Sequence, residues 1–309
     1  MKEVRREQVQ VRPRDVRAVE RCRRIKRSQI EKHRNPQFRI RVVKDADVEF
    51  IWATDMFARI HRAAEESRPL VMILPNPCPT YRHVARLINA MKVNCSRVHL
   101  FAMDEYANEN GEVAPDTWEF GFGYAMKKHF FAQIDPKLRM PEKNVHVFTT
   151  RNVKDYGRML ADLGGADACY SGPGWTGHLA FIEPDAPEFD LLLKQWMQCG
   201  PRIVTLSPFT LAQNSLHGSF GMSGDLSAVP PKAATIGPAE VIASKYRMDV
   251  SALLIHGTQT TWQRLIARLC YHGPVTPRLP TSIHQLLKTD AYISESIARD
   301  IKPDWEKGY

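Results

Sequence analysis

The sequence lacks any apolar run approaching the roughly 18 residues that a membrane-spanning helix needs. Its first thirty residues carry too many charges to form the hydrophobic region of a secretory signal peptide. None of its six cysteines forms a Cys-x-x-Cys pair, so the sequence suggests neither a zinc ribbon nor a redox dithiol. It also contains no internal repeat and no low-complexity segment. These absences predict a cytoplasmic globular protein with reduced thiols and without a membrane partner.

Little of the net positive charge lies outside the first 37 residues. Residues 1–37 hold 13 of the 43 basic and 5 of the 34 acidic residues, which leaves 30 basic and 29 acidic residues in a nearly neutral remainder. A net charge of +9 would suggest nucleic acid or membrane partners if it were spread evenly. The 309 residues, 43% of them hydrophobic, can bury an ordinary core in one large α/β domain or two smaller ones. We predict a basic extension over residues 1–37 and a single α/β domain over residues 38–309.

The extension carries a helical pattern. Between Asp15 and Arg34, apolar residues recur every three positions with Arg and Lys between them, at Val16, Val19, Cys22 and Ile25. This spacing predicts an amphipathic helix with a basic opposite face. Its apolar stripe could dock on the domain or on another subunit, and its arginines could bind the phosphates of nucleic acid. Docking or solvation is favoured because no aromatic residue interleaves the bases to stack on nucleobases, so nucleic acid is not expected as a partner.

After Gln37, short apolar runs alternate with helical patterns. The apolar runs predict strands at residues 70–74, 98–103, 145–148, 168–171, 203–206, 233–236, 253–256 and 291–294. Helices are predicted at residues 48–66, 81–91, 118–133, 153–163, 239–246 and 260–271. This alternation is typical of a mostly parallel sheet with helices on both faces. We therefore predict a doubly wound, Rossmann-like α/β fold that is preceded by the N-terminal helical extension.

The segment from Ser171 to Pro184 places His178 and Glu183 beside a glycine-rich turn. Glycines let a backbone bend sharply and approach a ligand where a Cβ would clash, so His178 is predicted to face a cleft. An alternative is that both residues simply cap a strand, because a motif match is only a hypothesis.

Polar residues also follow two other predicted strands. Asp104-Glu105-Tyr106 follows the strand at 98–103, and Pro75 to Thr80 follows the strand at 70–74. In open sheets of this type, ligands bind outside the carboxyl ends of the strands. An Asp-Glu pair at a strand end is commonly a helix cap or a solvated loop, but its combination with the His178 segment favours a functional site.

Two blocks carry a combined pattern, Met103-Asp104-Glu105-Tyr106 and Gly172-x-Gly174-x-x-Gly177-His178-x-Ala180-Phe181-x-Glu183-Pro184. Together they resemble the signature pair of glucosamine-6-phosphate deaminases, also called isomerases, and more distantly the 6-phosphogluconolactonases. Shorter blocks extend the likeness, namely Phe130-Phe131, Pro141-Glu142-Lys143-Asn144-Val145, Asn214-Ser215, Val229-Pro230 and Thr235-Ile236-Gly237. The resemblance covers roughly residues 38–300 and leaves the basic extension outside.

The resemblance implies proton-transfer chemistry on an amino sugar, namely aldose–ketose isomerisation with or without deamination. It implies Asp104 as the base at C2, His178 as the acid and base that opens the ring, and Glu183 as the carboxylate that orients and charges His178. A carboxylate and an imidazole are chemically suited to these transfers. It further implies a sugar or sugar phosphate as the small-molecule substrate, no metal, no organic cofactor, and a homo-oligomer.

The chain departs from the family pattern both beside the histidine and at the phosphate site. Family deaminases have an Asp just before the Gly-His pair, whereas this chain has Thr176, and a hydroxyl cannot stabilise an imidazolium as a charge does. The family's Thr-Gly-Gly-Thr loop, which cradles the sugar phosphate, is replaced by Asn76-Pro77-Cys78-Pro79-Thr80, and two prolines remove two amide donors. The family's phosphate-binding Lys and Arg align with Thr260 and Leu216. The resemblance therefore implies a rebuilt phosphate subsite.

The substrate-binding prediction comprises Asn76, Thr80, Glu105, Gly174, Thr176, Gly177 and Thr260. A substitute cation, for example Arg82, Arg202 or Lys232, could restore phosphate binding. One hypothesis is an isomerase, deaminase or lactonase-like enzyme acting on a sugar that lacks the 6-phosphate. The alternative is a non-catalytic sugar-binding or regulatory protein that retains the fold, which the Thr176 change and the proline loop favour.

Overall fold

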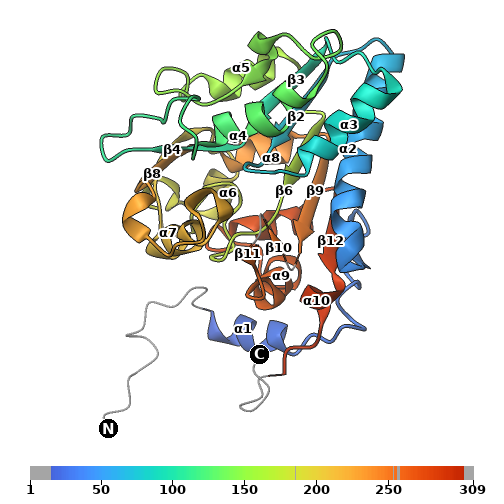
Figure 1. Cartoon of the computed structure of the whole chain (residues 1–309). Helices are drawn as coiled ribbons and strands as arrows, with labels where there is room; N and C mark the ends of the chain where they lie inside the picture. The colour runs from blue at the N-terminus through green and yellow to red at the C-terminus, as the bar shows by residue number, and fades with distance from the viewer. Residues whose placement is uncertain (1–14, 185, 253, 256–257, 303–309) are drawn as a thin grey trace.

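Seven parallel strands form the central sheet (Figure 1). In spatial order they are β1 (Phe38–Val43), β12 (Thr289–Ser294), β9 (Tyr246–Ser251), β6 (Ala168–Ser171), β2 (Leu70–Leu74), β3 (Val98–Ala102) and β5 (Val145–His146). Every neighbouring pair in this sheet is parallel. The computed structural model describes residues 15–302 except 185, 253, 256 and 257.

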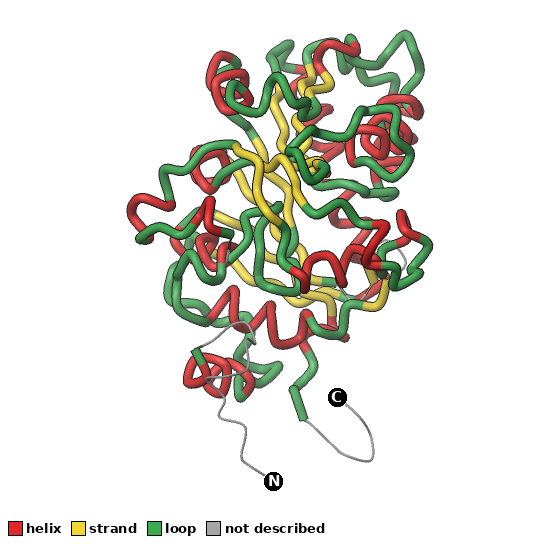
Figure 2. The backbone as a smooth tube through the Cα atoms, turned by 90° about the vertical axis from the view of Figure 1, so that its left-hand side faces the viewer, coloured by secondary structure: helices red, strands yellow, loops and turns green. Residues whose placement is uncertain are grey.

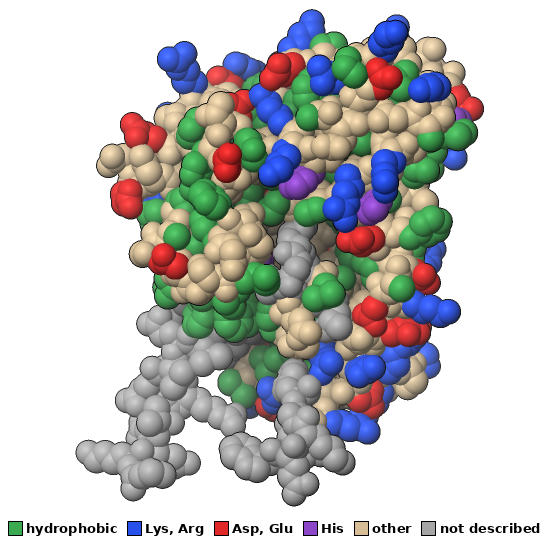
Figure 3. Space-filling view, viewed as in Figure 1, with side chains coloured by type: hydrophobic (Ala, Val, Ile, Leu, Met, Phe, Trp, Pro, Cys, Tyr) green, Lys and Arg blue, Asp and Glu red, His purple; other side chains and the backbone are tan. Residues whose placement is uncertain are grey.

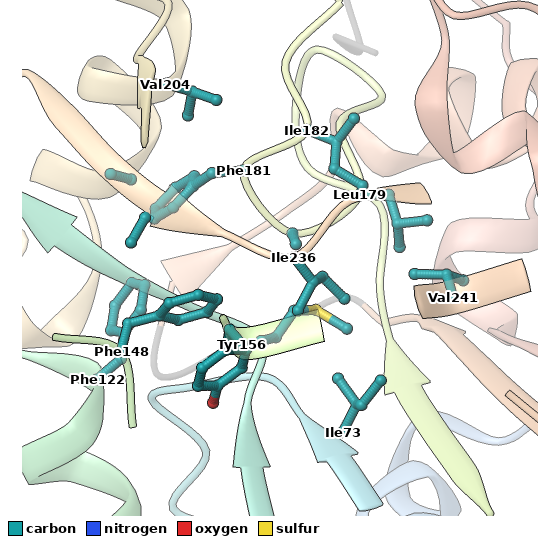
Figure 4. Packing of buried hydrophobic residues seen from close by; sticks show 14 of the residues in the cluster. Ile73, Phe122, Phe148, Tyr156, Leu179, Phe181, Ile182, Val204, Ile236 and Val241 are labelled. Atoms are coloured by element: carbon teal, nitrogen blue, oxygen red, sulfur yellow. The ribbon is translucent and has the colours of Figure 1, made fainter. Parts of the chain in front are cut away.

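Helices cover both faces of this sheet, which confirms the doubly wound α/β prediction. All five residues of β2 are buried, because the strand has protein on both sides. Leu70, Met72 and Leu74 join an apolar cluster with α2 (Val48–Glu65) and α3 (Tyr81–Met91). Val71 and Ile73 point the other way, into a cluster with α5 (Tyr156–Asp162) and α8 (Pro238–Ala243). Figure 4 shows side chains of this second cluster converging between the strands and α8.

The remaining helices are short and lie around the sheet, as the tube view of Figure 2 shows. The α-helices are α1 (Val16–Arg23), α4 (Phe122–His129), α6 (Leu193–Trp196), α7 (Pro208–Ser215), α9 (Gln263–His272) and α10 (Glu295–Ala298). The 3-10 helices are η2 (Asp45–Asp47), η3 (Phe131–Gln133), η4 (Glu142–Asn144), η5 (Pro187–Phe189), η6 (Gly218–Phe220), η7 (Leu226–Ala228) and η8 (Pro280–Leu286). Within the described part of the chain, every helix is too short or too polar to span a bilayer.

A second sheet, of three antiparallel strands, was not predicted. It consists of β4 (Asp104–Ala107), β8 (Lys232–Thr235) and β7 (Arg202–Thr205) in that order. The chain leaves the central sheet after β3 and enters β4 at once. Met103, between the two strands, donates its backbone N–H to Leu74 O at the end of β2, and its carbonyl oxygen accepts a hydrogen bond from Ile236 N, just after β8. The predicted strands at 203–206 and 233–236 therefore belong to the second sheet. This junction buries Asp104 at the carboxyl end of β3.

The strand β9 was not predicted; it begins at Tyr246, where the helix predicted over residues 239–246 ends. Helix α8 ends at Ala243, and β9 begins at Tyr246. Arg247 and Asp249 concealed this strand, because buried charges interrupt the apolar run expected of a central strand. Of the strand predicted at 253–256, Leu253 and His256 lie outside the described residues, while β10 (Leu254–Ile255) pairs with β11 (Thr258–Gln259) in a separate hairpin. Strand β1, with its alternating burial, was also not predicted.

The N-terminal helix α1 is shorter than the predicted apolar stripe and ends at Arg23. Ala18 and Cys22 are buried, and Cys22 joins an apolar cluster with residues of α9. Buried Arg268 of α9 donates hydrogen bonds to the carbonyl oxygens of Ile25, Ala298 and Arg299, which ties the two ends of the described chain to the domain. Residues 1–14 of the predicted extension lie outside the described residues.

Candidate active site

A cavity of about 450 Å³ opens at the carboxyl ends of four neighbouring strands, β9, β6, β2 and β3. This is the edge where open parallel sheets bind ligands. Five predicted site residues line it, namely Asn76, Thr80, Asp104, Gly174 and His178. Asp104 and His178, 74 positions apart in the sequence, thus face one shared space. Figure 3 shows that the molecular surface is hollowed near the centre of this face.

His178 is held from behind by two hydroxyl groups. Its Nδ1 lies 3.0 Å from Thr176 Oγ1 and 3.1 Å from Thr210 Oγ1. Thr176 donates its own hydrogen to Glu183 Oε2 at 3.3 Å, while His178 Nδ1 itself is 3.7 Å from that oxygen. Because the Thr176 hydrogen goes to Glu183, the network assigns the imidazole hydrogen to Nδ1 and leaves Nε2 for the cavity. Thr176 and Glu183 therefore support His178 and do not line the cavity.

Gly174 packs directly against the imidazole of His178. A Cβ added at Gly174 would lie 1.8 Å from His178 Nε2 and 2.2 Å from the adjacent ring carbons. No other residue type fits this contact without displacing the ring. The glycine-rich turn is thus required for the position of the histidine at this wall of the cavity.

Asp104 is buried at the start of β4, with 7% of its surface exposed. None of the residues that the structure describes donates a hydrogen bond to its carboxylate within the usual distance. Burial, together with the neighbouring charge of Glu105, raises the pKa of the Asp104 carboxyl well above its ordinary value. A carboxyl group with a raised pKa in a cavity is suited to accept and return a proton near neutral pH.

Glu105 does not line the cavity, in contrast to the prediction that it binds substrate. Its carboxylate accepts hydrogen bonds from the backbone N–H groups of Tyr106, Phe122 and Gly123 at 2.9, 3.0 and 2.6 Å. Burial raises the pKa of the Glu105 carboxyl to about 7, although these three donors limit the rise. Since successive residues of a strand point to opposite faces, Asp104 and Glu105 could not both face the same side of β4. Glu105 anchors the start of α4.

Two further residues of the substrate-binding prediction lie behind the cavity wall. Gly177 has a φ of +80°, and a Cβ there would lie 2.2 Å from Leu279 Cδ1, so this position of the turn requires glycine. Thr260 is fully buried, and its hydroxyl donates a hydrogen bond to the carbonyl oxygen of Ala252. Neither residue lines the cavity.

The cavity lining has few cations. Of the three substitute cations considered, Arg82 at the start of α3 lines the cavity. Arg202 is instead bonded to the carbonyl oxygens of Gly200 and Glu188, and Lys232 also lies outside the lining. Among the described lining residues, Arg82 is the only Lys or Arg, whereas Glu49 and Asp104 both contribute carboxylates.

Sequence reasoning missed several lining residues that come from α2 and α7. Trp52 and Glu49 of α2 line the cavity, as do Asn214 of α7 and His217 just after it. Burial and the nearby His178 lower the pKa of His217 to about 4, so its imidazole is neutral at physiological pH. Only Asn214 carried a signal in the sequence, as part of the Asn214-Ser215 block. The others reach the cavity through the packing of distant elements.

A buried polar network lies beneath the cavity floor. Ser171 Oγ donates to Asp249 Oδ1 at 2.5 Å, Tyr271 donates to Asp249 Oδ2 at 2.6 Å, and His284 Nε2 lies 3.2 Å from Ser171 Oγ. These residue types occur in nucleophilic triads, but there the serine donates its hydrogen to a histidine that the carboxylate orients. Here Ser171 donates its hydrogen to the carboxylate of Asp249, and this bond joins β6 to β9. Nowhere in the described residues are three His, Cys, Asp or Glu side chains grouped to hold a metal ion.

Comparison with known proteins identifies the family of this chain. No protein-family model matches it. A glucosamine-6-phosphate deaminase of Mannheimia succiniciproducens is 30% identical over 237 residues, which cover 72% of this chain and 75% of that protein. The chain belongs to the glucosamine-6-phosphate deaminase family. A second member of this family, from Phocaeicola vulgatus, is 29% identical over 220 residues, or 67% of this chain and 75% of the relative.

Solved structures share the fold of this deaminase-family chain. A monomeric glucosamine-6-phosphate deaminase superposes with a TM-score of 0.68 at 18% identity, over 84% of this chain and 98% of that one. The 6-phosphogluconolactonase of Leishmania guyanensis superposes with a TM-score of 0.59 at 13% identity, over 85% and 98% of the two chains. The predicted resemblance to both families is therefore confirmed. Because the solved deaminase is monomeric, the homo-oligomer expected for this chain stays a prediction.

Proposed function

We propose that this protein is an acid–base enzyme of amino-sugar metabolism that isomerises an amino aldose, with or without release of ammonia. The observation that carries the proposal is the convergence of Asp104 and His178 on one cavity, in a chain of the glucosamine-6-phosphate deaminase family. Arriving from separate strand ends, the two side chains provide a carboxyl and an imidazole for successive proton transfers.

In the proposed reaction, His178 Nε2 exchanges a proton with the ring oxygen and opens the sugar. Asp104 then removes the proton from C2 and delivers it to C1. The resulting iminium reacts with water, so that one amino aldose and one water give one ketose and one ammonia. Glu183 stabilises the positive imidazole through the Thr176 hydroxyl, which bridges them at 3.0 and 3.3 Å.

We further propose that the substrate lacks a 6-phosphate. The prolines of the Asn76–Thr80 loop donate no amide hydrogen, and the Thr260 hydroxyl is used by the Ala252 carbonyl. Glu49 and Arg82 both line this cavity and both are exposed, so solvent screens their opposite charges and neither one favours or excludes a dianion there.

Ammonia release tests this proposal with two substrates, glucosamine and glucosamine 6-phosphate. We expect kcat/KM for glucosamine to equal or exceed the value for the phosphate. A strong preference for the phosphate would refute the rebuilt subsite but leave the enzyme class intact. If neither sugar is deaminated or isomerised, the non-catalytic alternative, which the missing charge at Thr176 favours, becomes the better account. Sugar binding without turnover, measured by calorimetry, would then support it.

Replacing Thr176 by Val should lower kcat about 10- to 100-fold, the range typical when a partner that orients a functional histidine is removed. Valine keeps the shape of threonine but removes the hydroxyl that links His178 Nδ1 to Glu183. Steady-state ammonia release measures the effect, and Thr176→Ser, which keeps the hydroxyl, serves as the control. Equal kcat values for Thr176→Val and the wild type would show that the bridge has no catalytic role.

A further inference from the structure

Glu105 lies behind the cavity wall and caps the N-terminus of α4 from the strand β4. The residue at the usual capping position of α4 is Gly121, which has no side chain to accept hydrogen bonds from the first turn. The Glu105 carboxylate takes this role, because Oε1 accepts from Phe122 N at 3.0 Å and Oε2 accepts from Gly123 N at 2.6 Å. A residue 17 positions away in the sequence therefore ties β4 to the start of α4.

The surroundings of this carboxylate suit two acceptor oxygens. Oε1 also accepts from Tyr106 N at 2.9 Å, and we call the three hydrogen bonds from Tyr106, Phe122 and Gly123 the Glu105 clamp. Hydrogen bonds donated to a carboxylate favour its ionised form. A Cβ at Gly121 would lie 3.3 and 3.4 Å from the two oxygens, and one at Gly123 would lie 3.3 Å from Oε2. Both glycines therefore leave room for the carboxylate of Glu105, which is only 1% exposed.

Each of the two elements that the clamp joins contributes a residue to the cavity wall. On β4, Asp104 directly precedes Glu105 and lines the cavity, and on α4 Phe122 lines it. Phe122 stacks on Phe181, with ring centroids 5.7 Å apart and 22° between the planes. Phe181 in turn makes an edge contact with His178, at 6.2 Å between centroids. The clamp is thus connected to Asp104 through the backbone and to His178 through two aromatic rings.

Two simpler roles explain less of this arrangement. Glu105 does not line the cavity, so it does not bind the substrate. A cap that served only the stability of α4 could be a Ser or Asp in place of Gly121, which would reach the same N–H groups without burying a charge. Burial raises the pKa of the Glu105 carboxyl to about 7, so ionising it lowers the stability of the folded protein. This unfavourable term indicates a role beyond capping.

The charge of Glu105 also acts on Asp104. The pKa of the Asp104 carboxyl is raised by burial first and by the charge of Glu105 second. Other titratable groups face the pair, namely Tyr81, Tyr106, Asp116 and Tyr156, with Glu49, Arg82, His178 and His217 along the cavity. Burial raises the pKa of the three tyrosines, so they are uncharged near neutral pH. The Asp116 carboxylate forms a partly exposed ion pair with Lys127 at 2.6 Å, where solvent screens its charge.

We propose that Glu105 is a positioning residue of this site, whose ionised carboxylate fixes Asp104 and Phe122 on the cavity wall and places a negative charge behind Asp104. This inference rests on the proposed function, in which Asp104 moves the proton from C2 to C1. Glu105 touches neither the sugar nor the departing ammonia and acts only through its neighbours. Loss of the clamp should lower kcat, and loss of the charge should change the pH at which Asp104 ionises.

The first test measures ammonia release from glucosamine and from glucosamine 6-phosphate across a pH series. Glu105→Gln keeps the size of the side chain, removes its charge and turns an amide NH2 group toward a backbone N–H of the clamp. We expect kcat to fall about 10- to 100-fold, as when a partner that orients a functional group is lost. The acidic midpoint of kcat/KM, which reports the free enzyme, should fall by about one pH unit, because a like charge beside Asp104 is removed.

Two further variants separate the charge of Glu105 from other effects. Glu105→Asp keeps the charge on a shorter side chain, so it should lower kcat but keep the wild-type midpoint. Glu240→Gln is the matched control, because the Glu240 carboxylate accepts from Gly237 N at 2.8 Å at the start of α8 and burial raises its pKa as well. Glu240 does not line the cavity, so this variant should keep both the wild-type kcat and the wild-type midpoint.

A second readout does not depend on turnover. Carboxyl-carbon NMR of protein with labelled aspartate follows the titration of Asp104, which is identified as the signal that Asp104→Asn removes. We expect the midpoint of this signal to fall by about one pH unit in Glu105→Gln and to stay unchanged in Glu240→Gln. If it falls but no sugar releases ammonia from the wild type, the proposed function fails and the action of Glu105 on Asp104 stands.

An unchanged Asp104 midpoint in Glu105→Gln overturns the inference even if kcat falls, because a merely structural role lowers kcat without changing the proton affinity of Asp104. An equal shift in Glu240→Gln overturns it as well. Should Glu105→Gln fail to fold, Glu105→Asp decides the question. A lower kcat at an unchanged midpoint then supports the positioning role, and a wild-type kcat contradicts it.

Discussion

Replacing Asp104 by Asn should lower kcat for ammonia release about 1,000-fold while leaving the fold intact. Asparagine keeps the size of the side chain but cannot accept a proton from C2, and general acid–base groups contribute roughly 100- to 10,000-fold. The carboxylate has no hydrogen-bond donor among the described residues, so the substitution breaks no such bond there. Steady-state kinetics and circular dichroism measure the two effects, and a variant with more than a tenth of wild-type kcat would exclude Asp104 as the base.

The same substitution should stabilise the protein above about pH 4, the pKa of an unfolded aspartate. Burial raises the pKa of the Asp104 carboxyl in the folded state. The protonated carboxyl therefore contributes its full stability below the pKa of the unfolded state, and this contribution is lost as pH rises through the pKa of the folded state. Asparagine does not ionise and avoids this loss. Urea denaturation at a series of pH values checks the trend, with the exposed Asp162→Asn as the control. A variant less stable than wild type at neutral pH would indicate a stabilising contact of the carboxylate.

Gly174→Ala should lower kcat at least 100-fold through displacement of His178. The added Cβ would lie 1.8 Å from Nε2, far inside contact distance. The imidazole has little freedom to retreat, because its Nδ1 is bonded to the hydroxyls of Thr176 and Thr210. Gly174 has no positive φ, so the expected effect arises from this contact and not from backbone strain. The loss of a correctly placed acid–base group accounts for the magnitude.

A matched control is Gly200→Ala, whose Cβ would lie at an ordinary 3.5 Å from Glu240 Oε1. This variant should keep wild-type kcat. In a His178→Ala background, Gly174→Ala should have almost no additional effect, because two substitutions that act through one group are not additive. A full, independent loss in that background would show that Gly174 acts in another way.

Much of the fold follows from local patterns. Strands such as β2 and β3 are continuous apolar runs, because both faces of a central parallel strand are buried. The strands that were missed carry different patterns. Strand β9 contains Arg247, which donates to the carbonyl oxygen of Val241, and Asp249, which accepts from Ser171 and Tyr271. No local signal shows that partners elsewhere in the chain satisfy these charges, so this strand was not predicted.

In the candidate site, too, some features follow from the local sequence and others from the tertiary structure. The sequence by itself determined that Asp104 and His178 each follow a predicted strand beside polar or glycine-rich residues, and the combination of the two segments, with the family resemblance, singled them out. Only the tertiary structure decided that Glu105 points away from the cavity, that Thr210 supports His178, and that Trp52 and Trp262 line the cavity. The physical reason is that a side chain's direction depends on the element that contains it, while its neighbours depend on the order of the strands in the sheet. That order, β9-β6-β2-β3 at the cavity, is set by packing between residues far apart in the chain.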